Sequence, residues 1–381
     1  MAKILIAGDF CPRARVAQLF EDGEFSTVLN EVVPYTLKAD FSVVNLECPI
    51  TSGHEVPIVK RGPNLSCSKK VIEVLKYAGF RCVTLANNHF RDYGDEACLN
   101  TISLLEAGGI GHVGGGRNLQ EAKKVLYIEI GDVKLAMINV CEHEFSIASD
   151  NRAGSAPLDL VDNYRQISEA KAASDFVIVI VHGGNELYQL PTPRMQKTYR
   201  WFVDIGADVV INHHQHCFTG QEIYNGKPIF YGLGNFCFDR PDTDNPIWNE
   251  GYMVTLTLCK DEEITYSVEP YKQCEKTSPS LRFLVGDELD TFKKKYGEFT
   301  EIISNPDRLR KAYRHYVEKS AKSYILETEP GNYIGRLNSL RVRNMFPKLH
   351  NNKSLLNLYS ILNCESHFDI IKEVIANKTG V

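Results

Sequence analysis

The chain has 381 residues, of which 43% are hydrophobic and 24% charged, a balance typical of globular rather than disordered proteins. This length suffices for one large core with an appendage, or for two ordinary domains. The formal net charge is −5 with both signs interspersed, so no basic run predicts binding to nucleic acid or anionic lipid. A small acidic or phosphorylated ligand is compatible with this charge, because a local field can oppose the net charge.

Cysteine usage and the lack of long apolar runs bear on the compartment. The eleven cysteines are scattered and form no CxxC pair with zinc-finger spacing, which favours reduced, mostly buried thiols. The apolar run at 4–7 is broken by Asp9 and is too short for a signal peptide. No stretch approaches the ~20 apolar residues of a membrane span. We therefore expect a cytoplasmic protein without a membrane span.

Short apolar runs alternate with segments of helical periodicity along the first part of the chain. Turn signals such as Gly131-Asp132 and Asn225-Gly226 separate paired runs, which predicts hairpins. Strands are expected at 4–7, 41–46, 82–86, 125–130, 133–140, 176–181, 208–211, 221–224, 228–231, 251–259 and 263–271. Helices are expected at 69–77, 95–107, 167–173 and 196–205. The alternation predicts a layered α/β domain with antiparallel additions at its edges.

The character of the sequence changes after about residue 272. Residues 281–381 are rich in Lys, Glu, Leu and Tyr, and segments such as 307–322 and 355–362 have helical patterning. The segment 276–280 has the composition of a linker. We therefore predict an α/β domain over 1–272 and a helical C-terminal extension over 273–381.

Polar residues able to bind metals stand directly after the predicted strands. They come from five separate segments of the chain: Asp9, Glu47, Asn88 with His89, His182, and His214 with His216. Because ligands of open α/β sheets bind outside the carboxyl ends of the strands, we expect these side chains to meet at one edge of one sheet. His214 and His216 would face the same side if the backbone there is extended.

The residue types suit two divalent ions. A carboxylate such as Glu47 can bridge two metals, while imidazoles and an asparagine oxygen complete the shells. Nitrogen and oxygen ligands of this kind favour Mn, Fe or Zn over Mg or Ca. A metal pair lowers the pKa of a bound water and stabilises an oxyanion, which suits hydrolysis of phosphate esters or amides.

Each residue alone has a simpler structural explanation. Asp9 could cap a helix, Glu47 could cap a turn, and Asn88 follows a pattern common in turns. Three imidazoles within four residues, at 213–216, are harder to explain by packing. We expect the other histidines to be structural or peripheral, in loops (His112, His143) or in the helical tail without a catalytic role (His315, His350, His367).

Five blocks of the sequence resemble a known family when taken together. They are Gly8-Asp9, Asn45 through Thr51, Leu85 through Gly94, Gly206 through His216, and Tyr231 through Phe236. In this order, across residues 3–260, they resemble the bacterial capsule-synthesis family associated with poly-γ-glutamate, called CapA, a branch of the calcineurin-like metallophosphatases. The tail is not covered by this resemblance.

The resemblance implies a four-layer α-β-β-α sandwich with a dinuclear metal site. In it, Asp9, Glu47, Asn88, His182, His214 and His216 would be metal ligands, and His89 would act with Asn88 in catalysis. His182 and His214 would bind one metal and His216 the other. The sequence departs from the wider superfamily at Cys11, which stands where a histidine ligand is usual.

Residues flanking these blocks are candidates for substrate binding. Arg61 and Arg91 could pair with an anionic substrate, because guanidinium groups bind carboxylate and phosphate in a bidentate manner. Glu186 and Asn235 fall within or beside the matched segments and could line the pocket. For Arg15 we expect simple solvation.

Three functions agree with these observations. The first is a hydrolase in which metal-activated water attacks a phosphoester or amide of an anionic polymer or its precursor. The second is a non-hydrolytic protein that binds a polymer or a partner in an exopolysaccharide pathway. The third is a domain in which metal serves folding alone. Family resemblance does not decide among them, since one fold carries many chemistries.

Overall fold

The first sheet forms around β1 (Ala2–Cys11), which is buried on both faces. The computed structural model describes residues 1–242, 244–328 and 352–379. In this sheet the strand order is β16-β15-β14-β1-β2-β3-β4, and β13 also pairs with β1. Strands β1 to β4 run parallel, whereas β14 to β16 add an antiparallel side. The bounds are β2 (Phe41–Leu46), β3 (Cys82–Thr84), β4 (Gly111–Val113), β13 (Asn235–Phe238), β14 (Glu250–Leu258), β15 (Thr265–Glu275) and β16 (Ser278–Phe283).

The second sheet has the order β11-β12-β10-β9-β7-β6. Its central strands are parallel and its two edge strands are antiparallel. The bounds are β6 (Leu126–Ile130), β7 (Val133–Cys141), β9 (Phe176–His182), β10 (Val209–His213), β11 (Gln221–Tyr224) and β12 (Lys227–Phe230). A small separate pair is formed by β5 (Gly115–Gly116) and β8 (Gly154–Ser155).

Alternation along the strands divides the interior into three apolar layers. Ile4 and Ile6 of β1 pack between the two sheets with Ile178 and Ile180 of β9, whereas Leu5 faces outward toward helices. On the outer face of the first sheet lie α1 (Ala14–Glu21), α4 (Val71–Tyr77) and α5 (Gly94–Gly108). On that of the second sheet lie α7 (Leu160–Ala173) and α8 (Pro193–Asp204). The predicted four-layer α-β-β-α sandwich is therefore confirmed.

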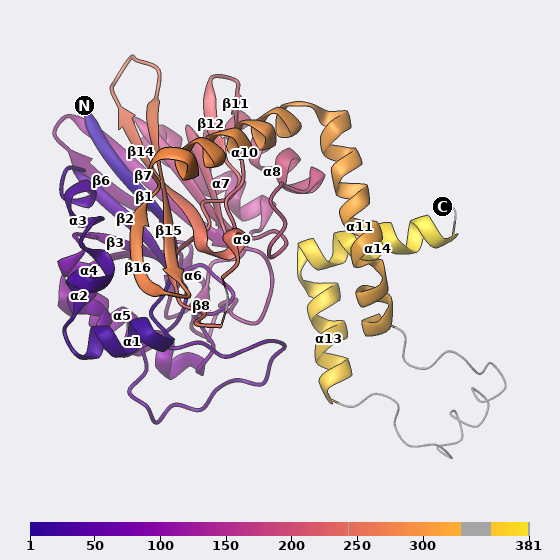
Figure 1. The fold of residues 1–381 in the computed structure, drawn as a ribbon, viewed down its shortest axis with the longest axis horizontal. Helices are drawn as coiled ribbons and strands as arrows, with labels where there is room; N and C mark the ends of the chain where they lie inside the picture. Colours follow the sequence, from indigo (N-terminus) through magenta and orange to yellow (C-terminus); the bar gives the residue numbers. More distant parts are fainter. Residues whose placement is uncertain (243, 329–351, 380–381) are drawn as a thin grey trace.

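The remaining helices are short connections or belong to the C-terminal part. The connections are α2 (Phe25–Leu29), α3 (Val33–Thr36), α6 (Leu119–Ala122) and α9 (Pro246–Asn249). The C-terminal helices are α10 (Gly286–Ser304), α11 (Pro306–Thr328), α13 (Asn352–Asn363) and α14 (Glu365–Thr379). Figure 1 shows α10 crossing one end of the sandwich and α11, α13 and α14 gathered beside it. None of the helices in the described ranges has the length and apolar character needed to cross a membrane.

The segment expected to be a linker is part of the first sheet. Residues 276–280 form the turn after β15 and the start of β16, with Glu275 paired to Ser278. Its Thr, Ser and Pro residues mark a hairpin turn, whose composition is the same as that of a linker. The helices begin only at Gly286. The division of the chain into two domains stays a prediction, and the expectation for His350 lies outside the described residues.

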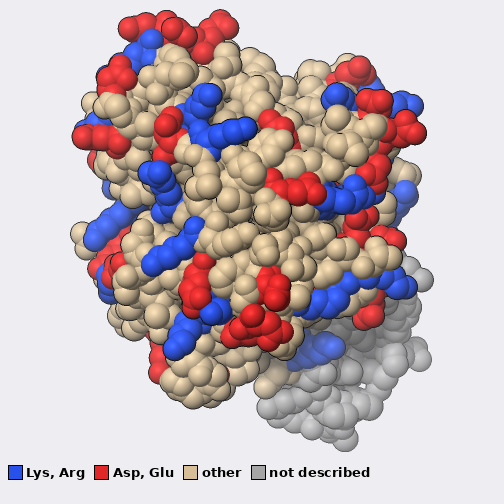
Figure 2. Space-filling model, turned by 60° about the vertical axis from the view of Figure 1, so that its left-hand side comes forward, with Lys and Arg blue, Asp and Glu red and all other residues tan. Residues whose placement is uncertain are grey.

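The surface and the thiols agree with the composition. Figure 2 shows a face on which Lys and Arg side chains are interspersed with Asp and Glu, without a broad area of one sign. All eleven cysteines carry free thiols, and all but Cys259 are buried.

Gly8 lies where β1 passes close to the loop that precedes β13. A Cβ atom at this position would lie 1.9 Å from the Gly234 carbonyl oxygen, which also accepts a hydrogen bond from the Asp9 amide at 3.1 Å. We expect Gly8→Ala to lower the free energy of unfolding by about 1–3 kcal/mol, since the backbone must shift. Urea denaturation measures this change.

The matched control is Gly297→Ala in α10, where an added Cβ would meet nothing within 4 Å. This change is expected to raise the unfolding free energy by about 0.5–1 kcal/mol, the usual gain for alanine over glycine inside a helix. A Gly8→Ala protein as stable as the unmodified chain would contradict the close approach of the two backbones.

Candidate metal centre

The first sheet contributes a carboxylate from each of two neighbouring strands. Asp9 lies in β1 at a point where the pairing of β1 with β2 and with β13 changes register. Such an irregularity re-aims a side chain without ending the strand. Asn45 holds the Asp9 carboxylate in place through a 2.8 Å hydrogen bond from its amide nitrogen. Glu47 follows β2 directly and is fully buried.

The second sheet contributes three imidazoles. His182 ends β9, and His214 and His216 follow β10. The expectation of extended backbone at the last two was wrong, because φ is +89° at His214 and +54° at His216. Residues other than glycine rarely adopt this left-handed region, and such backbone strain concentrates at functional sites. The turn still brings both rings to the site, as His214 Nδ1 lies 3.1 Å from His182 Nε2.

These side chains form two groups that share Glu47. Glu47, His182 and His214 make one group, and Asp9, Glu47 and His216 make the other, with ligand atoms within 4.8 Å of one another in each. The site therefore lies between the ends of two sheets, and the expectation that one sheet edge would supply all the ligands was wrong. The strand ends of both sheets point to the same place, because the sheets pack face to face.

The carboxylate of Glu47 shows why this arrangement suits cations. Both of its oxygens are buried without a hydrogen-bond partner among the described residues. A buried charge that is not compensated is costly, so such a group either takes a proton or binds a cation. The two groups that share this carboxylate are compatible with metal binding, and Glu47 would belong to both.

The pKa values in the site reflect burial without compensation. Burial raises the pKa of Asp9 to about 6, although the hydrogen bond from Asn45 lowers it. Burial and the nearby Asp9 also raise the pKa of Glu47 well above its usual value. Burial lowers the pKa of His216 to about 3 and that of His182 well below its usual value. The imidazoles of His182 and His216 are thus neutral near pH 7, as metal binding requires.

Asn88 and His89 extend the site on one side. Asn88 Oδ1 lies 3.0 Å from His182 Nε2, beside the first ligand group. His89 Nδ1 lies 2.6 Å from Asp92 Oδ2 and 3.1 Å from Lys60 Nζ. Nδ1 carries at most one hydrogen, and the shorter contact indicates that it donates this hydrogen to the Asp92 carboxylate. Lys60 forms an ion pair with the same carboxylate. His89 Nε2 is then the nitrogen available to exchange protons.

A cavity of about 230 Å³ opens over these groups. Of the predicted site residues, Asn88, His89 and His214 line it, and so do Arg61 and Glu186. The other lining residues are Lys60, Gly62, Pro63, Glu144, Asn185, Tyr316, Tyr324, Ser360 and His367.

Two residues expected at the substrate lie elsewhere. Arg91 pairs with Asp95 at the start of α5 and does not line the cavity. Asn235 instead orients a candidate ligand, since its Oδ1 lies 2.9 Å from His216 Nδ1 and its amide donates to the His216 carbonyl. Arg15, expected to be solvated, forms an ion pair with buried Asp239 at 2.7 Å.

His367 lines the cavity from α14, and the expectation that it has no catalytic role stays a prediction. Asp92 was not singled out, although it follows His89 by three residues within a matched block. Asn185 was not predicted to belong to the site either. It is 2% exposed, and its side-chain amide has no hydrogen-bond partner in the described ranges. His143, in contrast, is peripheral and pairs with Glu365 at 2.5 Å.

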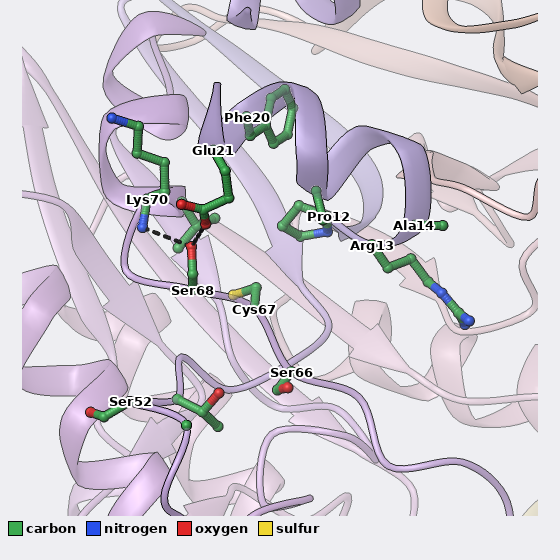
Figure 3. A pocket seen from close by; sticks show the side chains of 14 residues that line it. Pro12, Arg13, Ala14, Phe20, Glu21, Ser52, Ser66, Cys67, Ser68 and Lys70 are labelled. Atoms are coloured by element: carbon green, nitrogen blue, oxygen red, sulfur yellow. Dashed lines mark hydrogen bonds between the residues drawn. The ribbon is translucent and has the colours of Figure 1, made fainter. Parts of the chain in front are cut away.

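A second cavity, of about 480 Å³, lies beside α1. It contains none of the predicted metal ligands, and its polar groups bond to one another: Ser68 donates to Glu21 and accepts from the Lys70 amide. Figure 3 shows these three residues together on one side of the cavity, with Arg13 on the other side. Since none of its polar side chains is buried without a partner in the described part of the chain, we assign the site to the smaller cavity.

Two face-to-face sheets with carboxylates and imidazoles gathered at their shared end define a metallophosphatase-like α/β sandwich. Residues 3–240, more than half of the chain, match the model of the family described as bacterial capsule synthesis protein PGA_cap. The chain belongs to this family.

Two proteins of similar sequence agree with this membership. The chain is 30% identical to the capsule biosynthesis protein CapA of Bacillus anthracis over 62% of this chain and 59% of that protein, less than two thirds of its length. It is 29% identical to the PGA biosynthesis protein CapA of Bacillus subtilis, over 80% of this chain and 83% of that protein. A putative 5'-nucleotidase of Staphylococcus aureus, solved with α-ketoglutarate, aligns with a TM-score of 0.44 at 13% identity, covering 79% of this chain and 58% of that one.

Metal content distinguishes the two ligand groups. We expect about two transition-metal ions per chain in the purified protein, the number that a shared carboxylate serves. Glu47→Gln removes the shared ligand and is expected to leave about none, whereas His216→Ala removes one group and is expected to leave about one. Elemental analysis measures these contents. His315→Ala, a change of an exposed histidine in α11, serves as control. Equal metal content in all four proteins would contradict the site.

Metal affinity is expected to depend on pH through the carboxyl groups. Because the pKa of Asp9 is raised to about 6 and that of Glu47 is raised further above its usual range, protons compete with metal as pH falls through this region. The pKa values of His182 and His216 are low, so these two imidazoles add no competition until pH is far lower. Affinity should fall by roughly tenfold per pH unit below 6 for each displaced proton. Calorimetric Mn²⁺ titrations on both sides of pH 6 test this; a flat profile contradicts it.

Proposed function

We propose that the protein is a metal-dependent hydrolase that cleaves a phosphoester or an amide of an anionic substrate during capsule or poly-γ-glutamate biosynthesis. The observation that carries this proposal is the buried Glu47 carboxylate, shared between two ligand groups and without a hydrogen-bond partner in the described chain. A group of this kind is costly in a protein that binds no cation. The names of the two CapA relatives support the biosynthetic context.

In this proposal the residues around the site have different chemical roles. When bound, two divalent ions would lower the pKa of a water molecule and stabilise the developing oxyanion. His89 exchanges a proton at Nε2 with the reacting groups, and Asp92 fixes the orientation of its ring. Asn88 contacts His182 of one ligand group and orients what binds there. Lys60 and Arg61 line the cavity and supply positive charge for an anionic substrate.

His89→Asn tests the assignment of the proton-exchanging residue. We expect kcat for a generic phosphoester or a γ-glutamyl peptide to fall by about 10²–10⁴-fold, the usual contribution of general acid–base catalysis. Metal content should stay at the level of the unmodified protein, because His89 belongs to neither ligand group. His54→Asn, at an exposed histidine paired with Glu96, serves as control.

The same measurements also show which results would contradict a hydrolytic function. A protein loaded with two metals that turns over neither panel of substrates would contradict the proposed reaction. Binding of a polymer or a partner protein that survives removal of the metal would then favour the non-hydrolytic role. Loss of folding stability on chelation, with no ligand bound at all, would leave metal a purely structural role.

A further inference from the structure

The outer wall of the cavity comes from the C-terminal helices. The candidate metal centre forms the floor with Asn88, His89 and His214. Opposite lie Tyr316 and Tyr324 of α11, Ser360 of α13 and His367 of α14. The segment that the family match does not cover, beyond residue 240, therefore completes the pocket.

We infer that the C-terminal helices close the metal site into a pocket for a small terminal group that carries both an oxyanion and an ammonium, with Glu144 facing the ammonium and His367 contacting the group. This inference rests on the proposed function for the location of the reaction. It adds the chemical class of the substrate and a role for the extension.

The wall is anchored to the core by a buried polar network at the start of α14. Glu142, directly after β7, is 3% exposed, and it accepts hydrogen bonds from the Ser366 hydroxyl at 2.9 Å and the Ser366 amide at 3.2 Å. Arg194 of α8 pairs with Glu142 and also with Asp369 of α14. Burial alone would raise the pKa of Glu142, but Arg194 lowers it on balance, so the network is charged near pH 7. The helix is therefore fixed at the cavity independently of His367.

His367 lines the cavity, and one of its ring nitrogens is held by a neighbouring tyrosine. Its Nδ1 lies 2.6 Å from the Tyr324 hydroxyl, which holds the ring in place. Its Nε2 has no hydrogen-bond partner within the part of the chain that the structure describes. Burial, assisted by the charge of Arg61, lowers the pKa of His367 to about 4, so the ring is neutral near pH 7. A ring held at one nitrogen and available at the other suits contact with a ligand.

The lining carries both signs of charge. Lys60 and Arg61 line the cavity together with Glu144 and Glu186. Within the described ranges, Glu144 forms no ion pair or hydrogen bond, and burial raises its pKa. The buried amide of Asn185 also lacks a partner there. A ligand with an oxyanion alone would leave the Glu144 carboxylate without a counter-charge, whereas an ammonium group would provide one.

The volume of the cavity suits the end of a substrate chain better than its middle. Pockets for drug-sized ligands occupy roughly 300–1,000 Å³, and this cavity of about 230 Å³ is smaller. It accommodates one small unit. An oxyanion beside an ammonium occurs at the end of an amino-acid-based chain and in a phosphorylated amine, so carboxylate and phosphate are the two sources to separate.

The test uses ligand pairs that differ mainly by an ammonium group. Calorimetry with the full, Mn²⁺-loaded protein compares glutamate with glutarate, and phosphoethanolamine with ethyl phosphate. We expect the ammonium-bearing member of at least one pair to bind roughly tenfold more tightly, as for a charge-assisted contact. The pair that shows the preference identifies carboxylate or phosphate as the oxyanion.

Variants assign the preference to residues. Glu144→Gln is expected to abolish the advantage of the ammonium while leaving glutarate or ethyl phosphate bound as before. His367→Leu, which keeps a side chain of similar size, is expected to weaken both members of the preferred pair by roughly five- to tenfold. His315→Ala, on exposed α11 surface, is expected to change neither. Metal content is measured for each variant and should stay constant.

Several results would overturn the inference. Equal affinity within both pairs, or no binding of any of the four ligands, contradicts the zwitterionic ligand. Unchanged binding in His367→Leu contradicts the role of the C-terminal wall; should that variant fail to fold, the Glu144→Gln comparison still decides the ligand class. Selective binding without turnover would instead contradict only the hydrolytic reaction, so the two proposals fail separately.

Discussion

The uncompensated carboxylate of Glu47 is the constraint on which the rest of the site depends. A protein interior tolerates such a group only where something offsets its charge. Glu47 forms one group with Asp9 and His216 and a second group with His182 and His214. The neighbouring groups are arranged so that protons and cations compete for the same oxygens. Every further element of the site, from the strained turn after β10 to the amide of Asn235, fixes a side chain relative to this carboxylate.

Packing of the two sheets makes this arrangement possible. The layer of Ile4, Ile6, Ile178 and Ile180 between them sets their separation and brings the ends of β1 and β2 opposite those of β9 and β10. Apolar burial of this kind does not itself fix the orientation of the sheets, whereas each strand has a definite direction. Because both sheets have parallel central strands, their carboxyl ends coincide at one place, and polar groups that belong to distant parts of the sequence become neighbours.

Much of the fold and most of the centre could be predicted from local pattern. The run at 176–181 has the continuous apolar character of a strand buried on both faces, and it forms β9. Glu47, His182 and His214 were recognisable because each follows such a run. The predictions that were wrong concern features that depend on tertiary contacts. Positive φ at His214 and His216 follows from the turn that the packed sheets impose, and a turn composition at 276–280 does not say whether a hairpin or a linker follows.

The C-terminal contribution to the site was the least visible from sequence. A single histidine in a helical segment has no spacing to other ligands, so nothing local distinguishes His367 from His315. Its placement depends on Glu142 and Arg194, which are far away in the chain and meet α14 only in the folded structure. The pairing of Arg91 with Asp95, in contrast, joins residues only four apart in the sequence, at the turn before α5 and in the first turn of that helix.

The anchoring of α14 by Glu142 also has a consequence for biosynthesis. The ribosome delivers the strands that carry Asp9, Glu47, His182 and His214 long before it delivers residues 360–369, so the nascent sandwich can assemble its centre while one side of the cavity is still open. Contacts of such long sequence separation form late, because the loop they close is large. Ions therefore have an unobstructed route inward during synthesis, and the route narrows when α14 docks.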